Sequence, residues 1–359
     1  MHENLIGAIL TPYIINRLIL LFTLFMGALL LLMAALLIFY SNRQKLRTKR
    51  KQLAQMVVQK AIFYDSSADN PYGFYGYEHI RDRRFREVLV TDIISARKNL
   101  TGSAFIQLKE LYERLHLEKY ALRKLNSPRW HVKAQAIQEL AALQLEQYVQ
   151  KLSKLINHPN ELVRMETQTA LLQLRGFEGL EFLYQVSYPI SDWQQIKLLH
   201  QLQTLPPSAD TEITNWLRSE NDTVCILAIR IIKQFHLFQL HDALISCLDH
   251  SSAKVRKETI IALKDIYTAE TGNEIKKRYP LETPDNQLSM IQALQFIGTD
   301  DDIAFLKSNI PGASNELKIA IVRAIAAIDH IELTGFEMHE GSFDYPLPEI
   351  VRQIKEELV

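Results

Sequence analysis

A pair of apolar residues spaced three positions apart recurs along residues 127–330 at nearly constant intervals. The seven pairs are Leu140/Leu143, Leu171/Leu174, Leu199/Leu202, Ile232/Phe235, Leu263/Ile266, Leu294/Ile297 and Ile325/Ile328. Most steps between successive pairs are equal, and only those from Leu171 to Leu199 and from Leu199 to Ile232 are shorter or longer than the rest. A nearly fixed period of roughly 31 residues is typical of stacked helical units, because each unit buries its apolar face only against its neighbours. The chain is therefore expected to be all-α, with a solenoid of about seven helix pairs.

Polar turns separate the two helices of most copies. The turns include 157–160, 220–222, 249–252 and 312–315, which are rich in Asn, Asp and Ser. These side chains accept hydrogen bonds from the free N–H groups at a helix start. The second helix of each pair is expected to begin there and to carry the apolar pair.

The start of the second helix resembles HEAT repeats. The residues that carry the resemblance are Asn160, Val163, Arg164, Glu166, Ala170 and Leu171, and Val255, Arg256, Glu258, Ala262 and Leu263. The short period is similar to that of the HEAT-like repeats of bilin-lyase-type proteins. The resemblance implies that Arg164 and Arg256 bridge to an Asp or Asn of an adjacent repeat. Two copies depart from the pattern, at 191–193 and 286–288.

An uncharged run of 23 residues, Leu18–Tyr40, precedes the repeats. At about 1.5 Å per residue, a helix of this length crosses a hydrocarbon core of about 30 Å. The run is longer than the apolar region of a cleaved signal peptide. We therefore expect a single transmembrane helix within an N-terminal segment of residues 1–41.

Basic residues follow this run directly. They are Arg43, Lys45, Arg47, Lys49, Arg50 and Lys51, against Arg17 alone before the run. Positive charge is retained on the cytoplasmic side of a membrane. This asymmetry predicts a single-pass protein of the inner (cytoplasmic) membrane, with its N-terminus outside and the repeats in the cytoplasm. The basic cluster is interpreted as a topology signal that touches anionic headgroups.

Residues 42–126 are expected to form a stalk and two or three connector helices. Within them, Tyr72, Phe74, Tyr75 and Tyr77 lie on a segment that contains glycine and proline. Such aromatic residues either contact a partner or pack under the first helices of the repeats. After the repeats, residues 331–359 are expected to close the exposed end of the last repeat as a cap.

Charge and cysteine content exclude several classes of protein. Lys and Arg number 41, as do Asp and Glu, so the chain has no basic excess of the kind that nucleic-acid binders carry. The two cysteines, Cys225 and Cys247, lie in apolar stretches and are interpreted as core residues. We therefore predict no nucleic-acid partner and no disulfide.

No pattern of catalytic or metal-ligating residues is evident. His236 and His241 are five residues apart, which does not suit a metal site on one helix face. Some HEAT-like proteins are di-iron hydroxylases with recurring His-Glu pairs, but here His-Glu occurs only at 2–3 and 339–340, outside the repeats. No phosphate-binding glycine loop or nucleophile motif occurs. We predict neither an enzyme nor a cofactor, metal or small-molecule ligand.

These observations predict a membrane-anchored scaffold that binds a protein partner at the membrane. The layout also resembles an uncharacterised group of bacterial membrane-anchored HEAT-repeat proteins, which implies a partner such as a membrane-bound glycosyltransferase or transporter. Lys133, Lys197 and Lys318 lack an evident acidic partner and are candidates for partner binding, beside the aromatic segment. The alternative is an enzyme with an uncommon active site in the solenoid groove.

Overall fold

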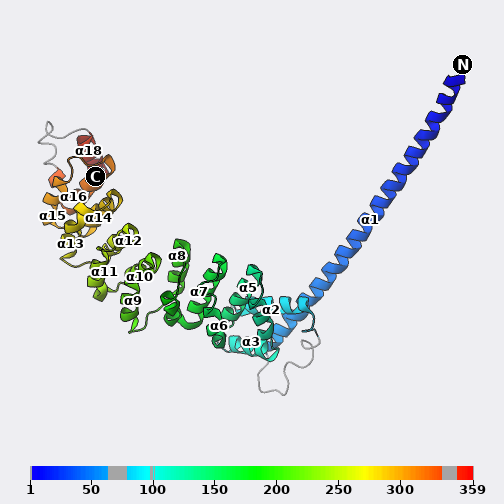
Figure 1. Cartoon of the computed structure of the whole chain (residues 1–359), viewed down its shortest axis with the longest axis horizontal. Coiled ribbons are helices and arrows are strands. Elements are labelled where there is room, and N and C mark those ends of the chain that lie inside the picture. Colours follow the sequence, from blue (N-terminus) through cyan, green and yellow to red (C-terminus); the bar gives the residue numbers. More distant parts are fainter. Residues whose placement is uncertain (1, 64–78, 98–99, 101, 334–345, 359) are drawn as a thin grey trace. The chain divides into compact units, whose positions relative to one another are not determined.

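Helices make up all the regular structure that is described. The computed structural model describes residues 2–63, 79–97, 100, 102–333 and 346–358, and no strand occurs among them. The chain divides into two compact units, Met1–Ser127 and Pro128–Val359. The all-α class predicted from the sequence is confirmed for the described residues (Figure 1).

The first unit contains the long apolar helix. Its helices are α1 (His2–Phe63), α2 (Arg83–Arg97), α3 (Ser103–Arg114) and α4 (Glu118–Leu125). Every side chain from Leu18 to Tyr40 is exposed, and α1 is the one described helix long and apolar enough to cross a membrane. Beyond the apolar run, α1 packs against α2 and α3 and buries Ala54, Val57, Val58 and Ala61. This end of α1 is therefore part of a small helical core.

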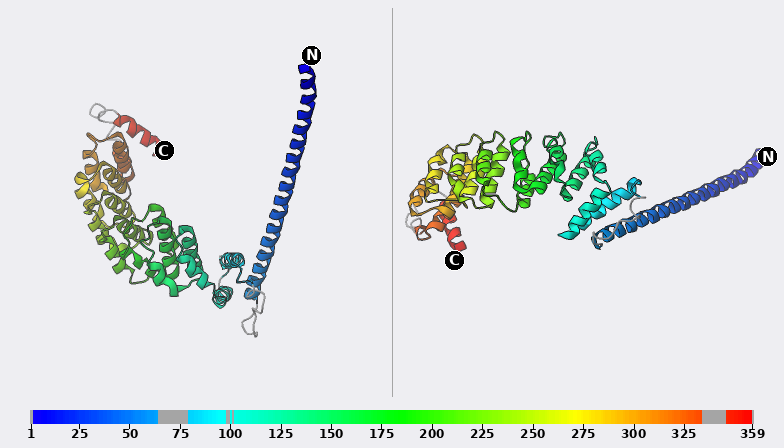
Figure 2. Two further views of the ribbon diagram at one scale, coloured as in Figure 1. Left: turned by 45° about the vertical axis from the view of Figure 1, so that its right-hand side comes forward. Right: turned by 90° about the horizontal axis from the view of Figure 1, so that it is seen from below.

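The second unit contains one series of helices that pack against each other in chain order. We call these the stacked helices, and they are α5 (Trp130–Ala142), α7 (Glu161–Arg175), α8 (Asp192–Gln201), α10 (Asp222–Gln234), α12 (Ala253–Leu263), α14 (Pro284–Ile297) and α16 (Asn315–Ile328). Figure 2 shows them following one another in chain order, from green through yellow to orange.

Shorter helices connect the stacked helices. They are η1 (Glu146–Tyr148), α6 (Val149–Ser153), η2 (Gly176–Tyr184), α9 (Ala209–Leu217), η3 (Phe238–Leu240), α11 (His241–Cys247), α13 (Thr271–Arg278), η4 (Tyr279–Leu281) and α15 (Asp300–Ser308). The segment η2 lies so close to α7 that a Cβ at Gly179 would be 2.2 Å from the Leu171 carbonyl oxygen. Both cysteines are buried and unpaired, Cys225 in α10 and Cys247 in α11.

The stacked helices begin at N-cap residues with a regular spacing. These are Arg129, Asn160, Ser191, Asn221, Ser252, Thr283 and Ser314, so the step from each cap to the next is the same to within one position. The residue eleven positions after each cap is buried, with at most 4% of its surface exposed. These buried residues are Leu140, Leu171, Leu202, Ile232, Leu263, Leu294 and Ile325.

This spacing corrects one copy of the sequence pattern. The third apolar pair is Leu202/Leu205 and not Leu199/Leu202, because Ser191 caps α8 by accepting a hydrogen bond from the Gln194 N–H. Leu202 is 4% exposed, whereas Leu199 is only half-buried. The two irregular steps of the sequence pattern, one short and one long, both come from this misplaced third pair.

The C-terminal helix α18 (Leu347–Leu358) packs against α16. It buries Leu347, Ile350, Val351 and Ile354, which recur at helical spacing, and Glu357 pairs with Arg323 of α16 at 3.1 Å. The apolar face of α18 therefore covers α16, the last of the stacked helices.

Candidate functional site

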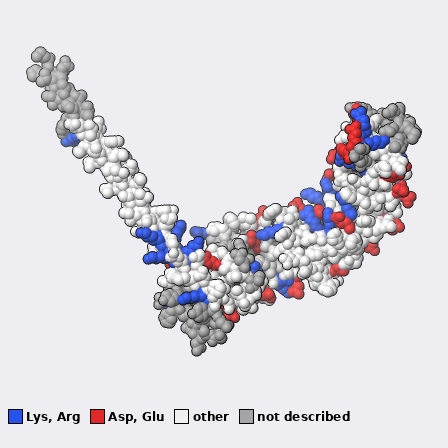
Figure 3. All heavy atoms as spheres, turned by 180° about the vertical axis from the view of Figure 1, so that it is seen from behind, with Lys and Arg blue, Asp and Glu red and all other residues white. Residues whose placement is uncertain are grey.

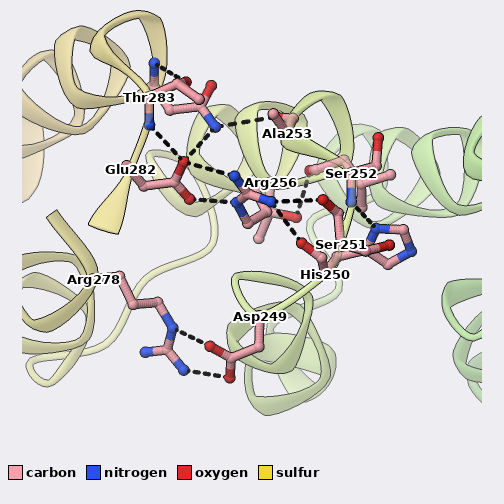
Figure 4. Close-up of polar contacts among 12 residues, drawn as sticks. Asp249, His250, Ser251, Ser252, Ala253, Arg256, Arg278, Glu282 and Thr283 are labelled. Carbon is pink, nitrogen blue, oxygen red and sulfur yellow. Dashed lines mark hydrogen bonds and ion pairs between the residues drawn. The ribbon is translucent and has the colours of Figure 1, made fainter. Parts of the chain in front are cut away.

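An arginine near the start of α12 joins two consecutive turns of the second unit (Figure 4). Arg256 donates from Nη1 to the carbonyl oxygens of His250 (2.8 Å) and Ser251 (3.0 Å). Its Nε and Nη2 donate to the two carboxylate oxygens of Glu282, at 2.5 and 3.1 Å. The Glu282 side chain is 4% exposed. Arg256 thus donates to two backbone carbonyl groups of the turn before its own helix, and it is also bonded to a side chain of the turn before the next stacked helix.

The protonation of Glu282 reflects this environment. Burial raises the pKa of the Glu282 carboxyl, but hydrogen bonds from Arg256 and Asn286 outweigh burial and hold the pKa below its usual value. Arg278, at the end of α13, donates to both carboxylate oxygens of Asp249 in the turn before α12, at 2.7 and 2.8 Å, and these hydrogen bonds lower the pKa of that carboxyl (Figure 4). Both carboxylates are therefore stabilised in the charged form.

Arg164 occupies the corresponding place at the start of α7. It donates to the carbonyl oxygens of His158 (2.9 Å) and Pro159 (3.0 Å). Its guanidinium lies 4.1 Å from the centre of the Tyr188 ring. The predicted bridge to an Asp or Asn was wrong about the partner of both arginines. Arg256 pairs with Glu282, and Arg164 lies over the aromatic ring of Tyr188. Both arginines join neighbouring turns and have a structural role.

The first unit contains the same arrangement, which the sequence pattern did not reveal. Arg86 in α2 donates to the carbonyl oxygens of Ile80 and Arg81, and lies 3.9 Å from the centre of the Tyr120 ring. Phe85-Arg86 corresponds to Val163-Arg164, with Asp82 accepting from the Arg84 N–H as a cap. Four arginines occur between residues 81 and 86, so the sequence alone did not indicate which of them makes these contacts.

Charged side chains on the stacked helices pair across neighbouring helices. Arg230 of α10 contacts Asp192 of α8 (2.9 Å) and Glu258 of α12 (2.9 Å). The other pairs are Lys197–Glu166 at 3.5 Å, Lys233–Asp265 at 3.2 Å and Lys257–Asp285 at 2.6 Å.

The structure does not bring the three predicted lysines together. Lys133, Lys197 and Lys318 lie on α5, α8 and α16, and all three are half-buried. Lys133 and Lys318 are four residues after their N-caps, as Arg164 and Arg256 are, whereas Lys197 is six residues after its cap. The expectation that Lys197 has no acidic partner was wrong, because it pairs with Glu166. Tyr72, Phe74, Tyr75 and Tyr77 lie outside the described residues.

Large apolar side chains are exposed on α7 and α8, the two helices that the Lys197–Glu166 pair joins. Trp193 and Ile196 of α8 are 70% and 55% exposed, and Leu162 of α7 is 46% exposed. Gln194 of α8 donates to the Met165 carbonyl of α7 at 3.0 Å, which fixes the register of the two helices. Leu162 and Trp193 are each two residues after an N-cap. We call Leu162, Trp193 and Ile196 the α7–α8 apolar patch.

A tryptophan in the third copy is the sequence feature that indicates this patch. Trp193 belongs to the third copy, which departs from the Val-Arg pattern. In α8 the buried positions next to it are Gln194 and Gln195, and Gln195 donates to the Ile190 carbonyl at 3.2 Å in the manner of Arg164. A tryptophan placed outside the buried face of an amphipathic helix is a candidate contact residue.

Metal-binding residues do not gather in the described ranges. No group of three or more His, Cys, Asp or Glu side chains able to hold a metal ion occurs there. An open hollow of about 980 Å³ borders Tyr184, Trp216 and Arg218, and the Trp216 Nε1 is buried without a hydrogen-bond partner. No nucleophile paired with a base lines this hollow.

Comparisons with known proteins give no family for this chain. No family model matches, and no curated protein matches. Among solved structures, an engineered protein is similar with 16% identity and a TM-score of 0.37, covering 86% of this chain and 95% of that one. Human deoxyhypusine hydroxylase in complex with glycerol is similar with 15% identity and a TM-score of 0.30, covering 79% and 98%. At these scores neither likeness carries an argument about fold or function.

Proposed function

We propose that the chain is a membrane-anchored HEAT-like solenoid of about seven helix pairs that holds a protein partner at the cytoplasmic face of the membrane. The proposal takes α1 as the anchor, with the N-terminus outside because the basic residues follow the apolar run. The regular spacing of the N-caps supports a repeat array of the HEAT-like kind. A membrane-bound glycosyltransferase or transporter is a partner of the expected kind.

The observation that carries the binding role is the α7–α8 apolar patch. Trp193, Ile196 and Leu162 expose large apolar surface beside charges that are already paired within the chain, such as Lys197 with Glu166. Exposed tryptophan flanked by other apolar side chains is typical of the centre of a protein interface. The partner is therefore expected to present an apolar segment, with Trp193 as the main contact.

The test uses a photoreactive amino acid in place of Trp193 in the full-length chain, in native membranes. The same amino acid at Leu281, which is 86% exposed in η4, is the matched control. We expect a discrete crosslinked protein from position 193 and none from position 281. The crosslinked protein is then identified and purified for a binding measurement.

Substitution of the patch provides the quantitative test. Trp193→Ala is expected to weaken binding of the identified partner by at least about 2 kcal/mol, or roughly 30-fold. Leu281→Ala removes a more exposed apolar side chain and is expected to leave the affinity unchanged. Equal effects of the two substitutions, or identical crosslinks from positions 193 and 281, would rule out the patch as the binding surface.

A further inference from the structure

A basic pocket lies between α1 and α2, just beyond the apolar run. Its volume is about 700 Å³. The basic residues that line it are Arg43, Arg47, Arg50 and Lys51 of α1, and Arg84 of α2. Arg43, Arg47 and Arg50 are spaced by four and three residues, so they share one face of α1. Figure 3 shows Lys and Arg gathered at this end of the long helix.

Most of this positive charge is not neutralised within the described parts of the chain. Arg50 pairs with Asp82 at 2.9 Å, but no ion pair joins Arg43, Arg47 or Lys51 to a described carboxylate. Glu87, one of two carboxylates in the pocket wall, bonds to Arg83 outside the pocket at 2.9 Å. Five bases and two carboxylates line the pocket, so its wall carries more positive than negative charge. The pocket therefore favours an anion.

Asp92 is the second carboxylate of the pocket wall. Its Oδ2 is buried without a hydrogen-bond partner. Burial raises the pKa of this carboxyl, and the charge of Lys51 works in the opposite direction. Lys51 lies close enough to act on Asp92 without forming a direct ion pair, so its ammonium group remains available to another anion.

The position of the pocket along α1 indicates where the anion comes from. At about 1.5 Å per residue, Arg43 and Arg47 lie roughly 5 and 10 Å beyond Tyr40, the last residue of the apolar run. Headgroup layers extend about 5–8 Å beyond the hydrocarbon core on each side. With Tyr40 at the edge of the hydrocarbon, the open pocket begins at the level of lipid headgroups.

We propose that this pocket binds the phosphate of an anionic phospholipid headgroup. The proposal rests on the membrane anchoring by α1. Arg43 and Arg47 approach the phosphate from the side of the membrane, and Arg84 approaches it from α2. Arginine suits this role because its planar guanidinium donates two parallel hydrogen bonds to phosphate oxygens. A lipid held in this way joins the end of the membrane helix to α2.

Two bases of the same cluster provide a matched control. Lys45 and Lys49 lie on the same stretch of α1 but do not line the pocket. The double substitutions Arg43→Gln/Arg47→Gln and Lys45→Gln/Lys49→Gln remove equal charge. A pocket that binds one headgroup distinguishes these variants, whereas general attraction between a basic helix and an anionic surface does not.

The experiment measures lipid bound to the full-length protein in neutral detergent by native mass spectrometry. The probes are phosphatidylglycerol, phosphatidylcholine and inorganic phosphate. We expect about one phosphatidylglycerol per chain and little of the other two. Arg43→Gln/Arg47→Gln and the single change Arg84→Gln should each weaken phosphatidylglycerol binding at least tenfold, and Lys45→Gln/Lys49→Gln by less than twofold. Circular dichroism checks that each variant keeps its helices.

Several outcomes would overturn the proposal. Equal losses in the two double variants would indicate a general basic attraction, and equal binding of phosphatidylcholine would remove the role of charge. Binding of inorganic phosphate as tightly as the lipid would make the pocket a free-phosphate site. Arg84 is exposed, so its substitution is expected to leave folding intact. It tests the contribution of α2 to lipid binding separately from that of α1. None of these outcomes alters the crosslinking result at Trp193, so the two proposals fail independently.

Discussion

At the scale of single residues, the second unit contains both buried and exposed ion pairs. Arg256 and Glu282 are 17% and 4% exposed, whereas Asp285, the partner of Lys257, is 70% exposed. Breaking a buried pair leaves an uncompensated charge, and breaking an exposed pair does not. The neighbouring residues Arg256 and Lys257 therefore allow a direct comparison of the two cases.

Arg256→Met is expected to lower the free energy of unfolding by on the order of 3 kcal/mol, because Glu282 remains buried without its partner. Lys257→Met is expected to cost at most about 1 kcal/mol. Denaturant unfolding of the full-length protein in detergent measures both. Similar losses in the two variants would mean that Arg256 does not join the two turns.

The same pair predicts a pH dependence. The pKa values of Glu282 and Asp249 are lowered in the folded chain, so both carboxylates stabilise the fold fully above their unfolded pKa values of 4.5 and 3.8. This stabilisation is lost as the pH falls through the lower folded values. We expect the free energy of unfolding to decrease below about pH 4.5, and to decrease less steeply in Glu282→Gln. An equal slope in both proteins would contradict this assignment.

At the scale of helices, polar turns and apolar spacing in the sequence located most of the helix starts in the second unit, but they left one register ambiguous. Leu199, Leu202 and Leu205 are each three residues apart, so apolar spacing alone permits two alignments of α8. The cap settles the choice, because the Ser191 side chain accepts from the Gln194 N–H. The interval between apolar pairs was less informative here than the helix start.

This register makes a prediction that separates two leucines of one helix end. Leu202→Ala is expected to lower the free energy of unfolding by about 2–5 kcal/mol, because the side chain is buried. The same loss is expected for Leu171→Ala and Leu263→Ala, whose side chains are also buried. Leu199→Ala is expected to cost at least about 1 kcal/mol less, since Leu199 is half-buried. A larger loss at Leu199 than at Leu202 in denaturant unfolding would restore the alignment read from apolar spacing.

The candidate sites were less predictable than the helices for a physical reason. Glu282 and Tyr188 each lie in the turn before the next stacked helix, far along the chain from the arginines that they contact. A helical period does not identify which residue of such a turn meets a given side chain. The pocket between α1 and α2 likewise joins Arg43 to Arg84, which are distant in the sequence. Such contacts depend on how helices pack, whereas N-caps and apolar spacing are local.

At the scale of the whole chain, the first unit contains an exposed apolar helix, and the second unit contains the α7–α8 apolar patch. Residues 18–40 are exposed along their whole length, and no described helix covers them. Burial of these side chains in lipid would remove a large apolar surface from water. This part of α1 is therefore long and apolar enough to cross a membrane, and the proposed side of the second unit rests on the flanking charges.

The orientation can be tested by reporters fused to the C-terminus. Six basic residues after the run against one before it predict that residues 41–359 remain in the cytoplasm. A reporter active only outside the cytoplasm is expected to be silent, and one active only inside is expected to give full signal. Replacing all six bases with Glu is expected to weaken or reverse this pattern, whereas Lys45→Gln/Lys49→Gln leaves four bases and is expected to preserve it. Strong activity of the external reporter in the unaltered chain would place the second unit, and with it Trp193, on the opposite side of the membrane.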